Sequence, residues 1–291
     1  MQPITLSICI VNWNTRALLR ACLQSLYRYP LAEPFEVIVV DNASPDGSAA
    51  MVRAEFPQVA LIANTQNLGY ARGNNQAMAR AQGELILLLN PDTEVFSDTL
   101  DCAVGFMRAH GEVGAIGARQ IFPDGRVQAS VRGFPTPANL LFEASGVARL
   151  FPRSRKLGGY RMRWFDYHQT AEVDQPMATF LMMRRAVVQQ VGLMDEAFPL
   201  FFNDVDWCYR VRQAGWKIYY VSDVRVLHHG GASTRQVRLS AIRESHRALE
   251  RFYAKHYRGR LNPLVYGLCI GAVRLGLWVR LAYARVRGAR S

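Results

Sequence analysis

The first half of the chain alternates between short apolar runs and segments whose apolar residues recur at helical spacing. The apolar runs at residues 6–11, 35–40, 59–63 and 84–89 predict buried strands. Helical periodicity predicts helices over residues 18–26, around 74–81 and over 97–110, the last with its cap at Ser97 or Asp98. Strands that alternate with helices in this way predict right-handed crossovers and a mostly parallel sheet, which is an α/β fold.

The second half is less regular. Residues 134–174 contain three prolines, a basic run at 153–156 and the pair Gly158-Gly159, which predict a long irregular insertion or flap. Regularity returns at 180–191. A helix is expected over 204–214, terminated by Gly215, with a strand at 216–221.

Composition favours one large domain with appendages, because the chain has 291 residues of which 50% are hydrophobic. The five cysteines are scattered and form no C-x-x-C pair, so neither a zinc site nor a disulfide framework is indicated. A reducing compartment suits this cysteine usage. The first residues also lack the features of a signal peptide, and we therefore expect a cytoplasmic protein.

The charge is concentrated at the C-terminal end. Of the formal net charge of +12, nearly all comes from the residues after 234, where thirteen basic residues face two acidic ones. Such a tail suits nucleic acid or an anionic membrane surface. The apolar stretch 264–286 is interrupted by arginines too often for a comfortable membrane span. A helix packed on the domain is one reading of it. We favour an interfacial helix that attaches the protein to a membrane.

Polar clusters at 12–14, 41–46 and 90–92 follow directly on predicted strands. Ligands of parallel sheets bind beyond the carboxyl ends of the strands, so these clusters should converge on one rim. Asp41 is either a turn residue or an acceptor for the imide N–H of uracil or thymine. Asp92 is well placed to ligate a hard divalent cation, whereas His228 could be structural or a ligand.

Several common enzyme motifs are missing from the chain. The sequence has no G-x-G-x-x-G after a strand, no G-x-x-x-x-G-K-[ST], no H-E-x-x-H and no G-x-S-x-G. These absences argue against four classes of enzyme: dinucleotide oxidoreductases, P-loop nucleotidases, zinc proteases with the H-E-x-x-H motif, and α/β-hydrolases.

The order of seven blocks, however, resembles glycosyltransferase family 2, in particular its bacterial rhamnosyltransferase-like branch. The blocks are SICIVNWN at 7–14, VIVVDNAS at 37–44, NLGYARGNN at 67–75, LLLNPD at 87–92, DEAF at 195–198, NDVDWCYR at 203–210 and HHGGAS at 228–233. The resemblance implies a GT-A fold over residues 1–235, with 134–174 as its irregular insertion. Residues 236–291 lie outside the resemblance as a basic helical C-terminal extension, and its apolar and basic residues would place it peripherally on the inner face of the cell membrane.

The resemblance also implies an activity: transfer of a sugar, with inversion, from a nucleotide-diphosphate sugar to another saccharide. The donor would be a dTDP- or UDP-sugar, and the branch suggests rhamnose as the sugar. The acceptor would be a saccharide or a polyprenyl-linked saccharide in cell-surface polysaccharide synthesis. No nucleic-acid partner is expected.

By the same resemblance, five residues surround the nucleotide. Asn12, Asn14 and Asp41 would line its pocket, and Asn67 and Arg72 would lie near the base or the diphosphate.

The remaining positions concern the metal and the chemistry. Asn90 and Asp92 occupy the two ends of the family's D-x-D motif, and Asp92 with His228 would bind Mg²⁺ or Mn²⁺. Asp204 takes the position of the general base. Two further departures from the family pattern accompany Asn90. Asn203 stands where a glutamate is usual, and Ala178-Thr179 replaces a Gly-Ala pair.

Two rival functions remain open at this point. A sugar-phosphate nucleotidyltransferase would need a glycine-rich loop with Lys or Arg after the first strand, where this chain has Asn-Trp-Asn-Thr-Arg at 12–16. A non-enzymatic scaffold would use its basic tail to bind nucleic acid.

Overall fold

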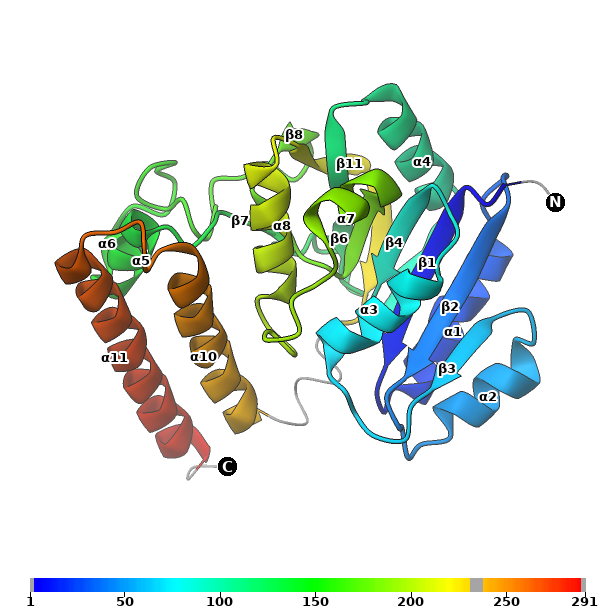
Figure 1. The fold of residues 1–291 in the computed structure, drawn as a ribbon, viewed down its shortest axis with the longest axis horizontal. Helices are drawn as coiled ribbons and strands as arrows, with labels where there is room; N and C mark the ends of the chain where they lie inside the picture. Colours follow the sequence, from blue (N-terminus) through cyan, green and yellow to red (C-terminus); the bar gives the residue numbers. More distant parts are fainter. Residues whose placement is uncertain (1–2, 231–237, 289–291) are drawn as a thin grey trace.

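The computed structural model of the protein describes residues 3–230 and 238–288 (Figure 1). The expected boundary between residues 235 and 236, and residues 231–233 of the last block, lie outside the described residues.

A nine-stranded sheet forms the centre of the molecule, and eight of its strands follow the order β3-β2-β1-β4-β10-β6-β11-β5, while β8 pairs with β11. The strands β1 to β4, β6 and β11 run in one direction, whereas β10, β5 and β8 are reversed. The predicted mostly parallel sheet is therefore confirmed. The strands are β1 Leu6–Asn12, β2 Phe35–Asp41, β3 Ala60–Ala63, β4 Leu85–Leu89, β5 Thr93–Val95, β6 Val113–Ile121, β8 Ala171–Glu172, β10 Phe180–Arg184 and β11 Lys217–His228. A separate small sheet pairs β7 Val131–Arg132 with β9 Gln175–Pro176.

Helices cover both faces of the sheet, because the central strands are buried on both sides. Ile8 and Ile10 of β1 join the core beneath α1, α2 and α4, while Cys9 and Val11 join the core beneath α3, α7 and α8. This alternation has the period of two expected of a strand. The helices are α1 Arg16–Arg28, α2 Ser48–Glu55, α3 Tyr70–Arg80, α4 Thr99–Ala109, α5 Pro137–Ala144, α6 Val147–Leu150, α7 Arg185–Val191 and α8 Asn203–Gln213.

Helix α3 begins four residues earlier than the sequence pattern suggests. Gly69 has φ +85°, a backbone conformation that favours glycine, and turns the chain into the helix. The first N–H groups of the helix, at Tyr70 and Ala71, then donate to the carbonyl of Pro199 at 2.7 and 3.2 Å. The start of α3 is thus fixed by a loop about 130 residues further along the chain.

The insertion at 134–174 is partly helical rather than wholly irregular. Helix α5 begins at Pro137, and the Thr136 side chain caps it by accepting from the backbone N–H of Asn139. The short α6 follows after Gly146. Helix α5 packs against the C-terminal helix, so the insertion is held to the rest of the molecule.

Two helices, α10 Arg238–His256 and α11 Pro263–Gly288, form a C-terminal hairpin beside the domain (Figure 1). Helix α10 buries Ala248, Phe252 and Tyr253 in the core next to α8, and α11 buries Cys269 and Val273. The predicted C-terminal helical extension is confirmed. One face of its last helix packs on the protein, and the other is exposed.

Candidate active site

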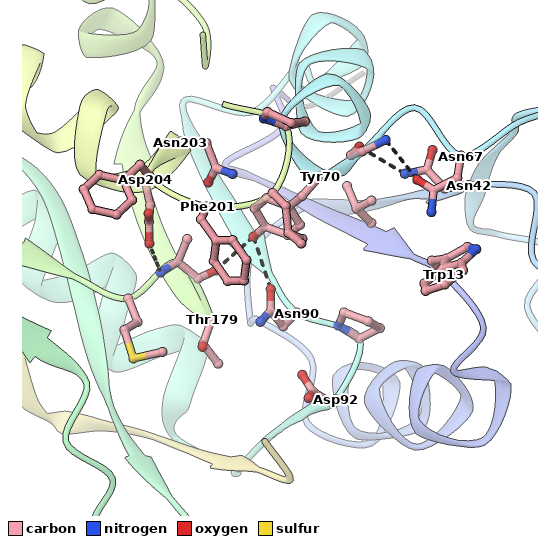
Figure 2. A pocket seen from close by; sticks show the side chains of 18 of the residues that line it. Trp13, Asn42, Asn67, Tyr70, Asn90, Asp92, Thr179, Phe201, Asn203 and Asp204 are labelled. Carbon is pink, nitrogen blue, oxygen red and sulfur yellow. Dashed lines mark hydrogen bonds between the residues drawn. The ribbon is translucent and has the colours of Figure 1, made fainter. Parts of the chain in front are cut away.

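A cavity of about 540 Å³ opens at the carboxyl ends of β1 and β4, between α3, the loop before α8 and the end of β11 (Figure 2). The strand ends converge there as the sequence predicts, since Asn12 pairs with Asp41 in the sheet register and β4 lies on the other side of β1. A cavity of this size suits a small-molecule ligand.

Five of the nine candidate residues line this cavity: Asn67, Asn90, Asp92, Asp204 and His228. They come from segments up to about 160 residues apart in the chain. The other four candidates, Asn12, Asn14, Asp41 and Arg72, lie behind or beside the lining.

Asn12 and Asp41 form a buried cluster at the ends of β1 and β2. Asn12 Nδ2 donates to Asp41 Oδ1 at 2.8 Å, and its Oδ1 accepts from Thr15 Oγ1 at 2.6 Å. Asp41 Oδ2 accepts from the backbone N–H of Ser44 at 3.0 Å. These bonds fix the turns after β1 and β2. The roles that the resemblance gives Asn12 and Asp41 at the nucleotide remain predictions.

The residues that reach the cavity from these turns are their neighbours, Trp13 and Asn42. Asn14 adopts φ +54°, a conformation that asparagine tolerates well, and its backbone N–H donates to Ser44 Oγ at 2.9 Å. The indole of Trp13 provides a flat apolar surface on which a base can stack. Sequence reasoning missed Trp13, although it stands inside one of the matching blocks.

Asn67 and Arg72 differ in their positions. The Asn67 side chain accepts from the backbone N–H of Gly69 at 2.9 Å, which holds the loop before α3. Arg72 is half-exposed and lies 3.8 Å from the carboxylate of Glu196. Its role near the base or diphosphate remains a prediction.

Asn90 is hydrogen-bonded to Tyr70, which the sequence reasoning also missed. The Tyr70 hydroxyl lies 3.1 Å from Asn90 Oδ1 and 3.2 Å from the carbonyl of Ala178 (Figure 2). Burial, together with the nearby Asp204 carboxylate, raises the pKa of the Tyr70 hydroxyl above its ordinary value, so it stays protonated and donates. Tyr70 therefore ties the end of β4 to the segment that faces Asp204.

Asp92 and His228 are buried side by side at the other end of the cavity. His228 Nε2 lies 3.4 Å from Asp92 Oδ1, and His228 Nδ1 lies 2.6 Å from Gln128 Oε1. An amide oxygen only accepts, so the proton of a neutral His228 is on Nδ1 and the lone pair of Nε2 faces the carboxylate. Two electron-rich atoms that face each other suit a cation between them.

This donor set fits a divalent ion that is completed by its substrate. Among residues 3–230 and 238–288, no group of three or more His, Cys, Asp or Glu side chains could hold a metal. Mg²⁺ characteristically takes one or two protein ligands and completes its shell with water and phosphate oxygens. The neighbouring His229 does not belong to this donor set, because its ring pairs with Glu94 at 2.7 Å.

Asp204 stands in the first turn of α8, with its carboxylate toward the cavity (Figure 2). The residue before the helix, Phe202 at the N-cap, has φ +67°, which is strained for a bulky side chain and sets the direction in which the helix begins. Asp204 Oδ2 accepts from the backbone N–H of Ala178 at 3.3 Å. Burial raises the pKa of Asp204 more than its backbone hydrogen bonds lower it. A carboxylate with a raised pKa is a better proton acceptor.

Asp206 is two residues further along α8 and has a different environment. It is fully buried, and it accepts from His256 Nε2 at 2.7 Å, Lys255 Nζ at 2.8 Å and Arg210 Nε at 2.9 Å. Burial alone would raise its pKa, but these three cationic or donating partners lower it to about 2. Asp206 therefore anchors α10 to α8 and does not face the cavity.

We expect Asp206→Asn to lower the free energy of unfolding by about 1–3 kcal/mol, because His256, Lys255 and Arg210 lose the buried carboxylate that accepts from them. Urea denaturation at neutral pH measures this change. Asp195→Asn is the matched control: Asp195 shares Lys255 but is partly exposed, so its loss should cost about 1 kcal/mol or less. Equal stability of Asp206→Asn and the unaltered protein would contradict an anchoring role.

The lowered pKa of Asp206 also predicts how the stability of the protein depends on pH. Because its folded-state pKa lies below the unfolded value of 3.8, its contribution of about 2 kcal/mol is present above pH 4 and is lost as the pH falls toward 2. The Asp206→Asn protein should lack this part of the acid destabilisation.

Comparison with known proteins places the site in context. Residues 7–191 match the model of glycosyl transferase family 2. The chain is 28% identical over 268 residues to the N-acetylglucosaminyl-diphospho-decaprenol L-rhamnosyltransferase of Mycobacterium tuberculosis, covering 87% of this chain and 86% of the relative. It is 25% identical over 228 residues to the low-salt glycan biosynthesis hexosyltransferase Agl10 of Haloferax volcanii, covering 77% and 67% of the two chains.

Solved structures show the same fold at lower identity. The mannosyltransferase PcManGT of Pyrobaculum calidifontis, in complex with GDP-Man and Mn²⁺, matches with a TM-score of 0.59 at 19% identity, over 98% of this chain and 76% of that one. TarS residues 1–349 of S. aureus, in complex with UDP-GlcNAc, match with a TM-score of 0.57 at 17% identity, over 92% and 70%. The predicted fold class is thereby confirmed.

Proposed function

The chain belongs to glycosyltransferase family 2, and from this membership we propose that it transfers a sugar, with inversion, from a nucleoside-diphosphate sugar to a lipid-linked saccharide. The observation that carries the proposal is one cavity with a general base at one end and a cation-binding pair at the other. Asp204 lines it from α8, Asp92 lines it from the turn between β4 and β5, and His228 lines it from the end of β11.

Each end of the cavity has its own part in the proposed reaction. Asp204 takes the proton of the acceptor hydroxyl while the hydroxyl oxygen attacks the anomeric carbon. The bond from that carbon to the diphosphate oxygen breaks as the new bond forms on the opposite face, so a single displacement inverts the configuration. Asp92 and His228 would hold Mg²⁺ or Mn²⁺, which when bound neutralises charge on the departing diphosphate.

The nucleotide and the acceptor are proposed from different observations. Trp13 and Asn42 supply a stacking surface and an amide where the cavity meets the buried Asp41 cluster, which suits a pyrimidine of a dTDP- or UDP-sugar. The printed name of the mycobacterial relative gives rhamnose as the sugar and a polyprenyl-diphosphate-linked saccharide as the acceptor. We carry rhamnose and this class of acceptor over to the present chain.

A thermal-shift and hydrolysis screen tests the proposal. With Mn²⁺ present, dTDP- and UDP-sugars near 100 times their Kd should raise Tm by roughly 5 °C, because a ligand that binds only the folded state stabilises it by about 2.7 kcal/mol. The same compounds should be hydrolysed slowly without acceptor. Purine nucleotide sugars are the matched control. Stabilisation by duplex DNA and by none of the nucleotide sugars would support the scaffold reading instead.

We also propose that α11 attaches the protein to the cytoplasmic face of the membrane. Residues 263–284 are long and apolar enough to cross a bilayer, with a mean hydropathy of 1.6, yet only 11% of that stretch is buried in the protein. At about 100° per residue, its exposed apolar side chains span an arc of about 140°, with Arg274 and Arg280 at opposite borders. The exposed apolar residues of α11 are Leu264, Val265, Leu268, Leu275, Trp278, Val279 and Tyr283.

An orientation in the plane of the membrane suits this helix better than a span. Its other face packs on α10, a helix with many charged residues, and Arg274 pairs with Glu250 of α10 at 3.2 Å. A span would carry these charges into the hydrocarbon, whereas an interfacial helix keeps the arginines at the headgroups.

Replacing Leu268 and Trp278 together by serine should weaken binding to vesicles of phosphatidylcholine and phosphatidylglycerol by at least about tenfold. Co-sedimentation at low salt measures it. Both side chains are exposed, with Trp278 at 72%, so folding should be unaffected. Leu193→Ser, at an exposed leucine outside α11, is the control. If the unaltered protein ignores anionic vesicles, α11 has only a structural role.

A further inference from the structure

The exposed large apolar side chains of the described residues are unevenly distributed. There are twelve of them, and α11 carries seven. Three more lie in the insertion on or directly after α5 and α6, and the last two lie in the segments before α8. The three in the insertion are Leu141, Leu150 and Phe151. Isolated exposed apolar residues are ordinary, but a concentration of this kind marks a surface that is covered by something else.

Leu150 and Phe151 form the tip of the insertion, and they are 76% and 54% exposed. They end α6, which Gly146 introduces with φ +80° and which buries only Ala148. The short helix therefore turns one small residue inward and directs its largest apolar residues outward. Exposed in this way, the two side chains add little to the stability of the folded chain.

The sequence around this tip is strongly basic. Between residues 144 and 165 there are six basic residues and no acidic one. Five of the six are exposed: Arg149, Arg153, Arg155, Lys156 and Arg163. Leucine and phenylalanine ringed by exposed cations suit the boundary between the headgroups and the acyl chains of an anionic membrane.

The insertion is attached to α11. Helix α5 packs against α11, and Leu140 of α5 shares a core cluster with Tyr266 and Ile270 of α11. In Figure 1, α5 and α6 lie beside the end of α11 at which that helix begins. The tip and the exposed face of α11 are thus parts of one packed unit.

We propose that the α5–α6 tip is a second lipid contact, which binds anionic phospholipid together with α11. This inference rests on the proposed membrane attachment by α11. A single interfacial helix fixes the line of attachment, but an apolar arc as wide as about 140° still allows the domain some rotation about the helix axis. A second contact from a separate segment removes that rotation, and so it holds the mouth of the active site in one orientation relative to a lipid-linked acceptor.

Two full-length variants test this contact: Leu150→Ser with Phe151→Ser, and Arg149→Gln with Arg153→Gln. The apolar variant should bind phosphatidylglycerol-containing vesicles about 10- to 100-fold more weakly. The charge variant should lose about fivefold per arginine at low salt and less at high salt. Leu193→Ser should bind as the unaltered protein does. Hydrogen exchange of residues 147–157 should slow when vesicles are added.

The outcomes separate this contact from attachment by α11. If the Leu268, Trp278 variant binds weakly and the Leu150, Phe151 variant binds normally, the second contact is wrong and the α11 attachment stands. If the unaltered protein binds no vesicles, both are wrong. Two further results would overturn the lipid assignment. One is that duplex DNA binds the tip and displaces the protein from vesicles. The other is a dimer in solution that the Leu150, Phe151 variant abolishes.

Discussion

Asp204→Asn is expected to lower turnover by about 10²–10⁴-fold while donor binding hardly changes, because an amide of the same shape cannot take up the acceptor proton. The amide oxygen can keep the shorter backbone hydrogen bond, from the N–H of Val205 at 2.8 Å, while the longer one from Ala178 at 3.3 Å is lost, so the start of α8 should hold its position. Turnover with a fixed acceptor and donor-induced thermal stabilisation measure the two properties separately. A large loss of donor binding would give Asp204 a different role.

Asp206→Asn is the companion variant, since it alters a neighbouring carboxylate that faces away from the cavity. It should lose stability and, at a temperature where it stays folded, retain turnover much closer to that of the unaltered protein. If the Asp206 variant were inactive while folded and the Asp204 variant were active, the position of the base would be wrong.

The pH dependence of turnover should follow Asp204. Since burial raises its pKa, the active carboxylate form is lost at a higher pH than an ordinary aspartate would allow. The acid limb of the turnover profile should therefore lie above the ordinary aspartate value of 3.8, and Asp206, with a pKa of about 2, cannot account for it. An acid limb below the ordinary aspartate value of 3.8 would contradict this environment for Asp204.

The strands that carry the site could be predicted because they are buried on both faces. β4 is a continuous apolar run and β1 and β2 are mostly apolar, and the observed bounds of all three differ from the predicted ones by one residue. β11 was predicted too short, because a register irregularity between Val221 and Arg225 places polar residues in the middle of the strand. The two- and three-residue strands carry too little pattern to be recognised.

The parts of the site that depend on distant contacts could not be predicted. Gln128 lies 100 residues from the histidine it contacts, and a lone glutamine in a polar segment has no pattern that signals this contact. Tyr70 likewise joins Asn90 to Ala178 only in the folded chain. Helix α5, by contrast, had a readable signal in Thr136-Pro137, since threonine at the N-cap and proline at the first turn favour a helix start.

Activity should depend on Mg²⁺ or Mn²⁺, and Asp92→Ala should reduce it by about 10³-fold or more, because the carboxylate is one of the two buried side chains proposed to bind the ion and the charge on the departing diphosphate would then be unopposed. His228→Ala should weaken use of the donor to a smaller degree. His229→Ala is the matched control, since the His229 ring pairs with Glu94. Full activity of the unaltered protein in excess EDTA would contradict this prediction.

Gln128→Leu tests the same site without removing a ligand. The Gln128 oxygen keeps the proton of His228 on Nδ1, which leaves Nε2 free to bind the ion. Without that oxygen, nothing fixes which nitrogen of His228 carries the proton. Loss of a residue that hydrogen-bonds to a metal ligand typically lowers metal affinity by about 10–100-fold. Titration with Mn²⁺, followed by calorimetry in the presence of nucleoside diphosphate, measures the change directly. Because Gln128 does not line the cavity, saturating Mn²⁺ should restore turnover in Gln128→Leu but not in Asp92→Ala. If Gln128→Leu bound Mn²⁺ as tightly as the unaltered protein, His228 would not be a ligand of the ion.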